Sequence, residues 1–562
     1  MINKSVSFLV RDTGTKEFHF KELNKIASSK AGEAGLLTLS ISSNPFSFAA
    51  EALPSLWTSQ PESCDEVFNQ YFACSIAQYL KLHDTAALHN KMSSNIRSLE
   101  ITQLPDGSWP WINGMKGDRD ITGMICSGIG RLEEIHIYNA YTDRLRQMGI
   151  KAFGYLDSAM IKDYDAVLKN GGTKNEAHLT PDIVNYLYAR TFWKVALGLK
   201  EAKAFYFWIE QAYNHTQNCN LMEKAMLVCA LNREDEQGAA NRLWRTIDSQ
   251  SLLDKETGIY WKDMPDGPGF HERPIETVCM LIEAYNIILR TNMKPIEEMC
   301  SWLIQHKSGN AWPTNTETAD AVYALLLRNN SLPATDNQIA ISIGGQMEDL
   351  KPGASSSNDG YLIRTWNAGD KKPDLDHFKV ENKSEAVEYG LFNLSYSAEY
   401  KEDKKMDFPM KMKKGIFVLV NINPVSQKYI QVNKKPEIKK GEIIVGEKTR
   451  IKKGGIITVR IELDVDKDID YICISDSIPN GFDSMDDSSK WINKDGTDYT
   501  SKIQGSRIHF YLAHLTKGNH VIEYIIRATQ SGTLPIGIAT IKPYYAPEYE
   551  RKTKPMKLKV KE

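Results

Sequence analysis

The apolar residues of this chain change their spacing near residue 335, and this change restricts the folds that the chain can adopt. From residue 45 to about 332 they recur at the i, i+3, i+4 spacing of amphipathic helices. From about residue 336 onwards they alternate with polar residues, which is the pattern of half-buried strands. The sequence therefore predicts a helical part followed by a β part.

Start signals open the first helices. Asn44-Pro45 places an N-cap residue before a proline at the first helical position, and Ser63-Cys64-Asp65-Glu66 has the pattern of a capping box. With these two starts, the chain has about twelve predicted helices joined by short connections. The further helical runs are expected at about 86–102, 119–137, 143–169, 180–195, 200–217, 219–233, 235–252, 273–290, 293–307 and 315–329.

A loop motif occurs three times in the helical part. Each copy has a glycine, then a tryptophan, then a polar stretch, then a helix start with a threonine. A helical hairpin cannot bury its apolar face alone, so repeated copies must stack or close on one another. We expect a closed α/α toroid, with an open superhelix as the alternative. The tryptophans are interpreted as loop anchors packed over helix ends, with ligand contact as the alternative. The motif residues are Trp109, Trp261 and Trp312, with Thr122, Thr277 and Thr318.

In the β part, apolar residues alternate with polar ones most clearly over 457–465, where Ile457, Val459 and Ile461 are followed by Leu463 and Val465. Short strands separated by turn signals indicate β-sandwich modules, and there is room for two, at about 336–410 and 411–562. Residues 401–460 carry 16 Lys+Arg against 6 Asp+Glu. This basic stretch is either a solvated face or a site for a polyanion or a membrane surface.

Composition excludes several classes. Lys+Arg total 69 against Asp+Glu 71 in 562 residues, so the chain lacks the basic surplus of a nucleic-acid binder. No stretch approaches the ~18 apolar residues of a membrane-spanning helix. The eight cysteines contain no C-x-x-C pair, which argues against zinc ribbons and redox motifs and favours buried free thiols. No metal site and no cofactor is expected, because no metal-ligand or phosphate-loop motif occurs.

Two kinds of chemistry remain open. Acidic residues cluster in the predicted toroid loops, and paired carboxylates at roughly 5 to 9 Å can cleave a glycosidic bond. The competing interpretation is that they are solvated or cap helices. Cys64, in the first turn of a helix, is either a nucleophile favoured by the helix dipole or a small apolar residue. The acidic residues are Asp106, Asp118, Asp120, Asp263, Asp266 and Glu272.

Several segments resemble bacterial alpha-2-macroglobulins in a fixed order. The first run includes Asn44-Pro45 and Pro61 to Tyr71, and resembles the start of their thioester domain. Tyr186 to Arg190, Ile275 to Ala284 and Ala319 to Leu326 resemble its helices, and Gly537 to Tyr549 resembles their final macroglobulin-like domain. The resemblance covers about 44 to 549. It implies a non-enzymatic protein with a thioester-type toroid at 44–332, and β modules on both sides of it. These are a stub of the preceding module at 1–43, a CUB-like module at 333–410 and a receptor-binding-type sandwich at 411–562.

The sequence departs from this family at its reactive motif, Cys-x-Glu-Gln. Cys64 and Glu66 are kept, but Val67 replaces the glutamine whose carboxamide supplies the acyl carbon of the internal thioester. Gln70 stands six residues from the cysteine and would require a different ring. We therefore expect no thioester and no catalytic residue.

The resemblance also implies location and partners. It implies a protease inhibitor or envelope-defence protein of the periplasm or cell envelope, although the chain shows no signal peptide. Its partners would be a target protease, trapped non-covalently by the complete protein, and upstream macroglobulin-like domains, of which this chain is expected to be the C-terminal part. The alternatives are a carbohydrate-active enzyme using Asp118 or Asp120, and a protein with a reactive thiol at Cys64.

Overall fold

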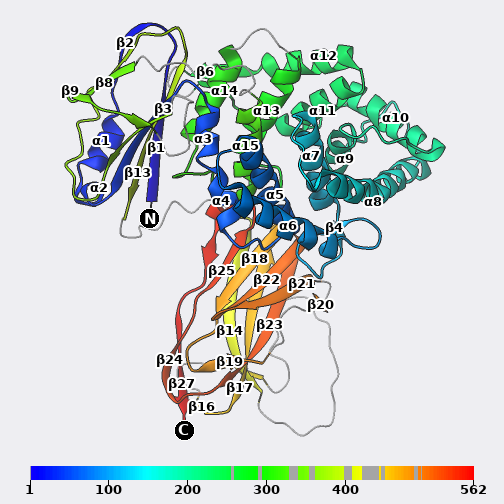
Figure 1. Ribbon diagram of the computed structural model, residues 1–562. Helices are drawn as coiled ribbons and strands as arrows, with labels where there is room; N and C mark the ends of the chain where they lie inside the picture. The colour runs from blue at the N-terminus through cyan, green and yellow to red at the C-terminus, as the bar shows by residue number, and fades with distance from the viewer. Residues whose placement is uncertain are drawn as a thin grey trace. The chain divides into compact units, whose positions relative to one another are not determined.

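The computed structural model describes residues 2–254, 258–288, 294–327, 339–352, 361–397, 408–419, 442–444, 450–485, 491–494 and 497–562. The chain divides into two compact units, Met1–Asp266 with His271–Asp403, and Gly267–Phe270 with Lys404–Glu562. The first unit contains a ring of helices and a β module, and the second is a β-sandwich (Figure 1). Among the described helices, none combines the length and the apolar character needed to cross a membrane.

The helices of the first unit form a closed ring. Within the described residues, each inner helix contacts the next along the chain, and α15 contacts α5, which closes the ring. The predicted α/α toroid is therefore confirmed, and the open superhelix is excluded. The inner helices are α5 (Cys64–Tyr79), α7 (Arg119–Glu134), α9 (Pro181–Arg190), α11 (Leu221–Arg233), α13 (Pro274–Ile288) and α15 (Asn315–Leu326).

Outer helices connect consecutive inner helices and cover their outward faces. This second layer explains why α13 is buried continuously over Ile275–Tyr285, since a helix enclosed on all sides needs no polar face. The outer helices are α6 (Thr85–Thr102), α8 (Thr142–Lys169), α10 (Leu199–Asn214), α12 (Gln237–Asp248) and α14 (Lys294–Gln305), with the short α3 (Phe46–Ala50) and α4 (Leu53–Thr58) beside α15.

The three tryptophans of the repeated loop anchor the ends of outer helices. The Trp109 indole N–H donates to the Leu99 carbonyl at 2.9 Å, near the end of α6. In the same way, Trp261 donates to Ile247 of α12 at 2.8 Å, and Trp312 donates to Leu303 of α14 at 2.9 Å. All three indoles are buried, which confirms that they are loop anchors. Short two-stranded ribbons accompany the first two loops, β4 (Trp109–Pro110) with β5 (Gly117–Asp118), and β6 (Ser251–Asp254) with β7 (Gly258–Trp261).

Strands from both sides of the toroid form one β module. β1 pairs with β13 in an antiparallel register from Ile2↔Tyr396 to Val10↔Glu388, and β2 pairs with β12. The two segments that the sequence analysis separated, 1–43 and 333–410, therefore share both sheets. One sheet has the order β1 (Ile2–Val10), β13 (Glu388–Tyr396), β3 (Leu36–Ser42), β11 (Leu362–Trp366), β10 (Lys351–Pro352). The other has β2 (Gly14–Phe18), β12 (Phe378–Asn382), β8 (Ile339–Ile343), β9 (Gln346–Glu348), with α1 (Lys21–Ala27) and α2 (Lys30–Glu33) alongside.

Phenylalanines fill the space between these two sheets. Phe8 of β1 packs edge-on against Phe378 of β12, with ring centroids 4.9 Å apart. Phe392 of β13 packs against the same Phe378 ring at 5.0 Å. All three rings are buried. Such aromatic packing contributes about 0.5–1.5 kcal/mol per pair beyond the buried area, so it ties together two chain segments that are distant in sequence.

The second unit is a sandwich built around the strand with the clearest period of two. The alternating apolar residues of β17 (Ile456–Val465) are buried, as the sequence predicted. One sheet has the order β15 (Glu442–Ile444), β14 (Met410–Leu419), β17, β23 (Gly518–Ala528), β19 (Phe482–Ser484). The facing sheet has β20 (Trp491–Lys494), β21 (Thr497–Gln504), β22 (Arg507–Leu515), β18 (Ile469–Ser477), β25 (Ala539–Pro543), β26 (Arg551–Lys552). A third has β16 (Arg450–Lys452), β27 (Met556–Lys561), β24 (Gly532–Ile536).

Two expectations from composition can be compared with the structure. All eight cysteines are buried free thiols, as expected. The basic stretch 401–460 lies largely outside the described residues, which include only 408–419, 442–444 and 450–460 of it. Its interpretation as a solvated face or a binding surface stays a prediction.

Candidate functional site

The segment that the sequence analysis compared with a thioester motif forms the first turn of α5, the inner helix that begins at Cys64. Ser63 is the N-cap residue, and its hydroxyl accepts from the Glu66 N–H at 3.4 Å. Glu66 in turn accepts from the Glu62 N–H at 2.8 Å. The Cys64 N–H donates to the Trp111 carbonyl at 2.9 Å, in the loop that precedes α7. The turn is thus fixed both by its own cap and by a neighbouring loop of the toroid.

The thiol of Cys64 is held in its neutral form. Its side chain is buried, and this burial raises the pKa of the thiol to about 12. Within this raised pKa, a hydrogen bond with Thr102 acts to lower the value, and the nearby carboxylates of Asp65 and Asp118 act to raise it. The helix start was one reason to consider Cys64 as a nucleophile, but loss of hydration dominates. The thiolate that a nucleophile requires is therefore scarce at neutral pH.

No free carboxamide follows Cys64 within the next two turns of α5. Val67, three residues on, is half-buried and carries no carboxamide. Asn69 donates to the Asn315 side chain at 2.8 Å, and Gln70 donates to the Ser59 carbonyl at 2.8 Å. Both amides are buried and are directed to partners outside the helix. The two carboxamides in these turns thus form hydrogen bonds with residues outside the helix.

A small hollow of about 60 Å³ lies where the inner helices begin. Asp120, at the start of α7, accepts from the Asn185 amide at 3.0 Å. Burial, and then the charge of Asp118, raises the pKa of Asp120 to about 7. Burial alone would lower the pKa of His271. The hydrogen bond between His271 and Glu276, at 3.3 Å, and the charges of nearby carboxylates have a larger effect, so the pKa of His271 is raised. The polar residues around the hollow are Asp65, Asn69, Asp120, Ser127, Arg131, Asn185, Tyr188, His271, Thr316 and Asp320.

A charged cluster separates this hollow from a second one near the ends of the inner helices. Arg131 lies 2.6 Å from Asp320 and 3.4 Å from Glu283. Glu283 also accepts from Arg233 at 2.8 Å and from the Tyr188 hydroxyl at 2.7 Å. The second hollow, of about 250 Å³, is lined by Glu283 and also by Glu134, Ile135, His136, Asn286, Ile287, Tyr323 and Leu327.

The acidic residues proposed from the sequence do not form one site. Asp118 caps α7 by accepting from the Ile121 N–H at 3.0 Å, and Asp106 accepts from the Ser108 N–H and hydroxyl within its own loop. Asp263 and Asp266 are exposed. Of the six, Asp120 lines the first hollow. Sequence reasoning missed Asp320 and Arg131, although a charge on the apolar stripe of a predicted inner helix was a usable signal.

Comparisons with known proteins agree with this architecture. A family model described as the bacterial alpha-2-macroglobulin MG10 domain matches residues 424–548. The alpha-2-macroglobulin homolog of Nostoc sp. is 27% identical over 369 residues, which are 62% of this chain and 18% of that protein. The chain therefore spans less than a fifth of the length of this curated relative.

Solved structures show the same fold over the whole chain. Native Escherichia coli alpha-2-macroglobulin, from domain MG7 to its C-terminus, matches with a TM-score of 0.62 and 10% identity, covering 100% of this chain and 82% of that one. A point mutant of Salmonella alpha-2-macroglobulin matches with a TM-score of 0.60 and 13% identity, covering 100% of this chain and 34% of that one.

The fold and these matches define a class, a helical toroid combined with macroglobulin-type β modules. Within that class, the chain is similar to the C-terminal part of bacterial alpha-2-macroglobulins. The resemblance seen in the sequence is therefore confirmed.

Proposed function

We propose that this chain is the non-enzymatic C-terminal region of an alpha-2-macroglobulin-like protease inhibitor or envelope-defence protein, and that it has no internal thioester. The observation that carries this proposal is Val67, which occupies the glutamine position of the family's motif, one turn after Cys64 on α5. A thioester forms when a thiol sulfur attacks a carboxamide carbon and ammonia leaves. A valine side chain offers no such carbon.

The surroundings of Cys64 support the same proposal. The thiol is buried, and its pKa is raised to about 12, so little thiolate is present to attack any carbonyl. The Gln70 amide, the next glutamine of the helix, donates to Ser59 instead. Any protease trapping by the complete protein would then be non-covalent and would depend on macroglobulin-like domains upstream of this region.

Intact-protein mass spectrometry tests the absence of a thioester. We expect the mass calculated from the sequence, unchanged by methylamine, together with one alkylated thiol per cysteine after unfolding. A native mass that is lower by one ammonia, and that increases by one methylamine on treatment, would overturn the proposal.

The inhibitory role is tested separately. We place the protein in the periplasm or cell envelope and expect inhibition of a target protease only by the chain joined to its upstream domains. A broad protease panel, assayed with a protein substrate and with a short peptide substrate, distinguishes physical enclosure from active-site blockage. Enclosure protects the large substrate and leaves cleavage of the small one intact. Inhibition of both substrates by this chain alone would contradict the proposal.

One observation favours the alternative, a carbohydrate-active enzyme. Asp120 lines a hollow and has a pKa raised to about 7, as a general acid would. The hollow, however, has about 60 Å³, space for a few water molecules rather than a sugar residue. We expect no reducing-sugar release from a polysaccharide panel. Release that is lost in Asp120→Asn would establish the alternative.

A further inference from the structure

We propose that Glu17, His19 and His377 bind one divalent transition-metal ion, with Zn²⁺ as the fitting example. Within the described part of the chain, one ligand atom from each of these three side chains lies within 4.8 Å of the other two. No metal site was expected from the sequence, because no metal-ligand motif occurs in it. Glu17 and His19 are about 360 residues away from His377 along the chain, so these residues form no local motif. The pairing of β2 with β12 brings the three residues together in space.

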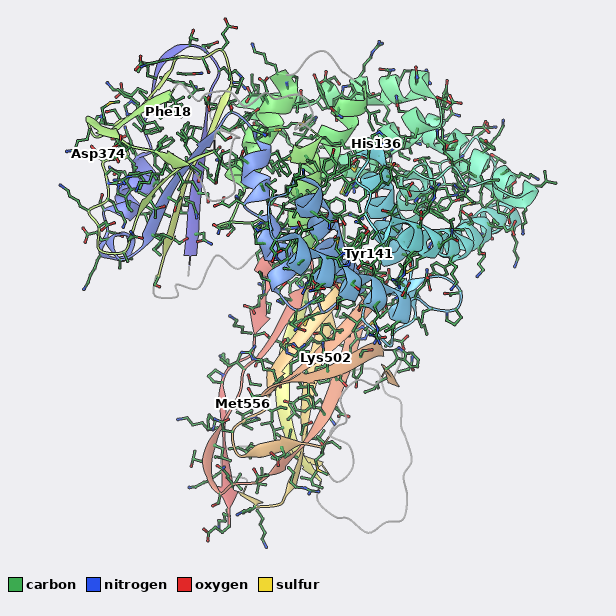
Figure 2. The ribbon with its side chains drawn as sticks, in the orientation of Figure 1. Phe18, His136, Tyr141, Asp374, Lys502 and Met556 are labelled. Carbon is green, nitrogen blue, oxygen red and sulfur yellow. The ribbon has the colours of Figure 1, made fainter. Side chains whose placement is uncertain are left out.

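The backbone explains why the three side chains share one face. Phe18 of β2 is directly opposite Phe378 of β12, and both rings pack into the core of the β module. Successive side chains of a strand point to opposite faces. The residues that flank these phenylalanines therefore face outward together. Glu17 and His19 flank Phe18, and His377 precedes Phe378. Figure 2 labels Phe18, the last residue of β2, which stands between Glu17 and His19 in the sequence.

The side chains remain accessible to an ion from solvent. Glu17 is 39% exposed, and His19 and His377 are 53% and 60% exposed. Glu17 lies on the paired strands, since β2 and β12 are paired from Gly14↔Asn382 to Phe18↔Phe378, and His19 and His377 stand directly beside the last of these pairs. The His377 backbone is also held, because its carbonyl accepts from the Gly344 N–H at 2.8 Å. A metal ligand on paired strands, such as Glu17, is held more rigidly than one on a loop.

The hydrogen bond of His19 prepares its ring for a metal ion. Its Nδ1 lies 2.6 Å from the Asp376 carbonyl oxygen, which can only accept, so Nδ1 carries the proton. In the neutral ring the other nitrogen then keeps its lone pair. Metal-binding histidines typically have one ring nitrogen engaged in this way by a carbonyl or carboxylate. The Asp376 carboxylate, 3.6 Å from His19 Nδ1, adds negative charge beside the site.

The donor set selects the class of metal. Two imidazoles and one carboxylate suit Zn²⁺, Cu²⁺ or Ni²⁺, whereas Mg²⁺ and Ca²⁺ prefer oxygen ligands. In a tetrahedral zinc site with bonds of about 2.0–2.1 Å, ligand atoms lie roughly 3.3 Å apart. Glu17 Oε1 and His377 Nδ1 are 3.9 Å apart, so exposed side chains need only small rotations. The remaining position is open to water.

Lys379 places a positive charge beside the proposed metal site. It follows Phe378 on β12, and its ammonium lies 3.4 Å from Glu17 Oε2. This cation competes with a metal ion for the same carboxylate. Removing it is therefore expected to strengthen metal binding, an effect that nonspecific surface binding would not show.

Isothermal titration of the full chain with zinc chloride at neutral pH tests the proposal. We expect one ion per chain, and affinity lowered at least about tenfold in His19→Ala and in His377→Ala. Lys379→Met is expected to bind more tightly, and magnesium chloride is expected not to bind. The matched control is His514→Ala, since His514 is an exposed histidine beside Asp470 outside the cluster, and it should leave zinc affinity unchanged.

A second measurement locates the ion. Zinc should slow amide hydrogen exchange over Gly14–Phe18, because β2 is an edge strand held by β12 alone in its sheet. His377→Ala, checked by circular dichroism for an intact fold, should lose this protection. The proposal is overturned if the wild-type chain binds no zinc, if the two histidine variants bind as it does, or if zinc leaves exchange in β2 unchanged.

Discussion

Arg131 of α7 donates to Asp320 of α15 inside the toroid, with Nη1 2.6 Å from Oδ1. The same guanidinium lies 3.4 Å from Glu283 of α13. One side chain thus links three inner helices that are far apart in sequence. All three charged groups are largely removed from water, with Arg131 and Asp320 each 15% exposed and Glu283 2% exposed.

Arg131→Met is expected to destabilise the chain by about 3–5 kcal/mol, because it leaves Asp320 without its cation in a buried site. Urea unfolding followed by tryptophan fluorescence measures this loss. Arg144→Met is the matched control, since Arg144 pairs with Glu100 on the exposed surface. We expect no measurable change there, and equal effects of the two substitutions would contradict the structural role of Arg131.

The tryptophan anchors give a second prediction. Trp312→Phe removes the N–H that reaches the Leu303 carbonyl, while most of the ring remains. The lost hydrogen bond is worth about 1 kcal/mol, whereas Trp312→Ala should cost about 3–5 kcal/mol through lost packing. The free energies of unfolding of both variants, compared with that of the wild type, measure these two losses of stability. If the two variants were equally stable, Trp312 would not be a packed anchor.

The sequence predicted the toroid, the sandwich and the tryptophan anchors because these follow from local spacing. The spacing of apolar residues shows which face of a helix is buried, but it does not show which distant residue will contact that face. The contacts of Arg131 with Asp320 and of His19 with the Asp376 carbonyl arise from closure of the ring and of the sheet, so spacing alone could not reveal them. At Cys64, the sequence favoured a buried thiol at a helix start, but spacing could not show that Thr102 and Asp118 would lie beside it.

Glu388 gives a prediction about pH. It is fully buried at the start of β13, and among the residues that the structure describes neither of its carboxylate oxygens has a hydrogen-bond partner. Burial raises its pKa from 4.5 to about 7. The folded state therefore keeps this proton up to about pH 7, whereas the unfolded chain loses it near pH 4.5. Stability consequently falls as pH rises through this window, by an amount on the order of 2–3 kcal/mol.

Glu388→Gln should remove this loss. The stability gain of the variant over the wild type should be small at pH 4.5 and largest at pH 8, as measured by urea unfolding at each pH. Glu385→Gln, at an exposed position of the preceding loop, is the control and should show no such trend. A gain that did not depend on pH would mean that Glu388 is charged in the folded state throughout this range.

Val67→Gln tests whether one residue accounts for the missing thioester. Residues i and i+3 of a helix are neighbours, with Cβ atoms about 5–6 Å apart, so a glutamine here would face the Cys64 thiol from the next turn of α5. Attack of the sulfur on its carboxamide carbon would release ammonia. We expect a fraction of Val67→Gln to have a mass lower by one ammonia, and this fraction to gain one methylamine on treatment. The double variant Cys64→Ala/Val67→Gln should keep its full mass, because it has no sulfur to form the bond. A full mass for Val67→Gln alone would contradict the prediction, and would mean that burial of the thiol, which raises its pKa to about 12, blocks the reaction even with the carboxamide restored.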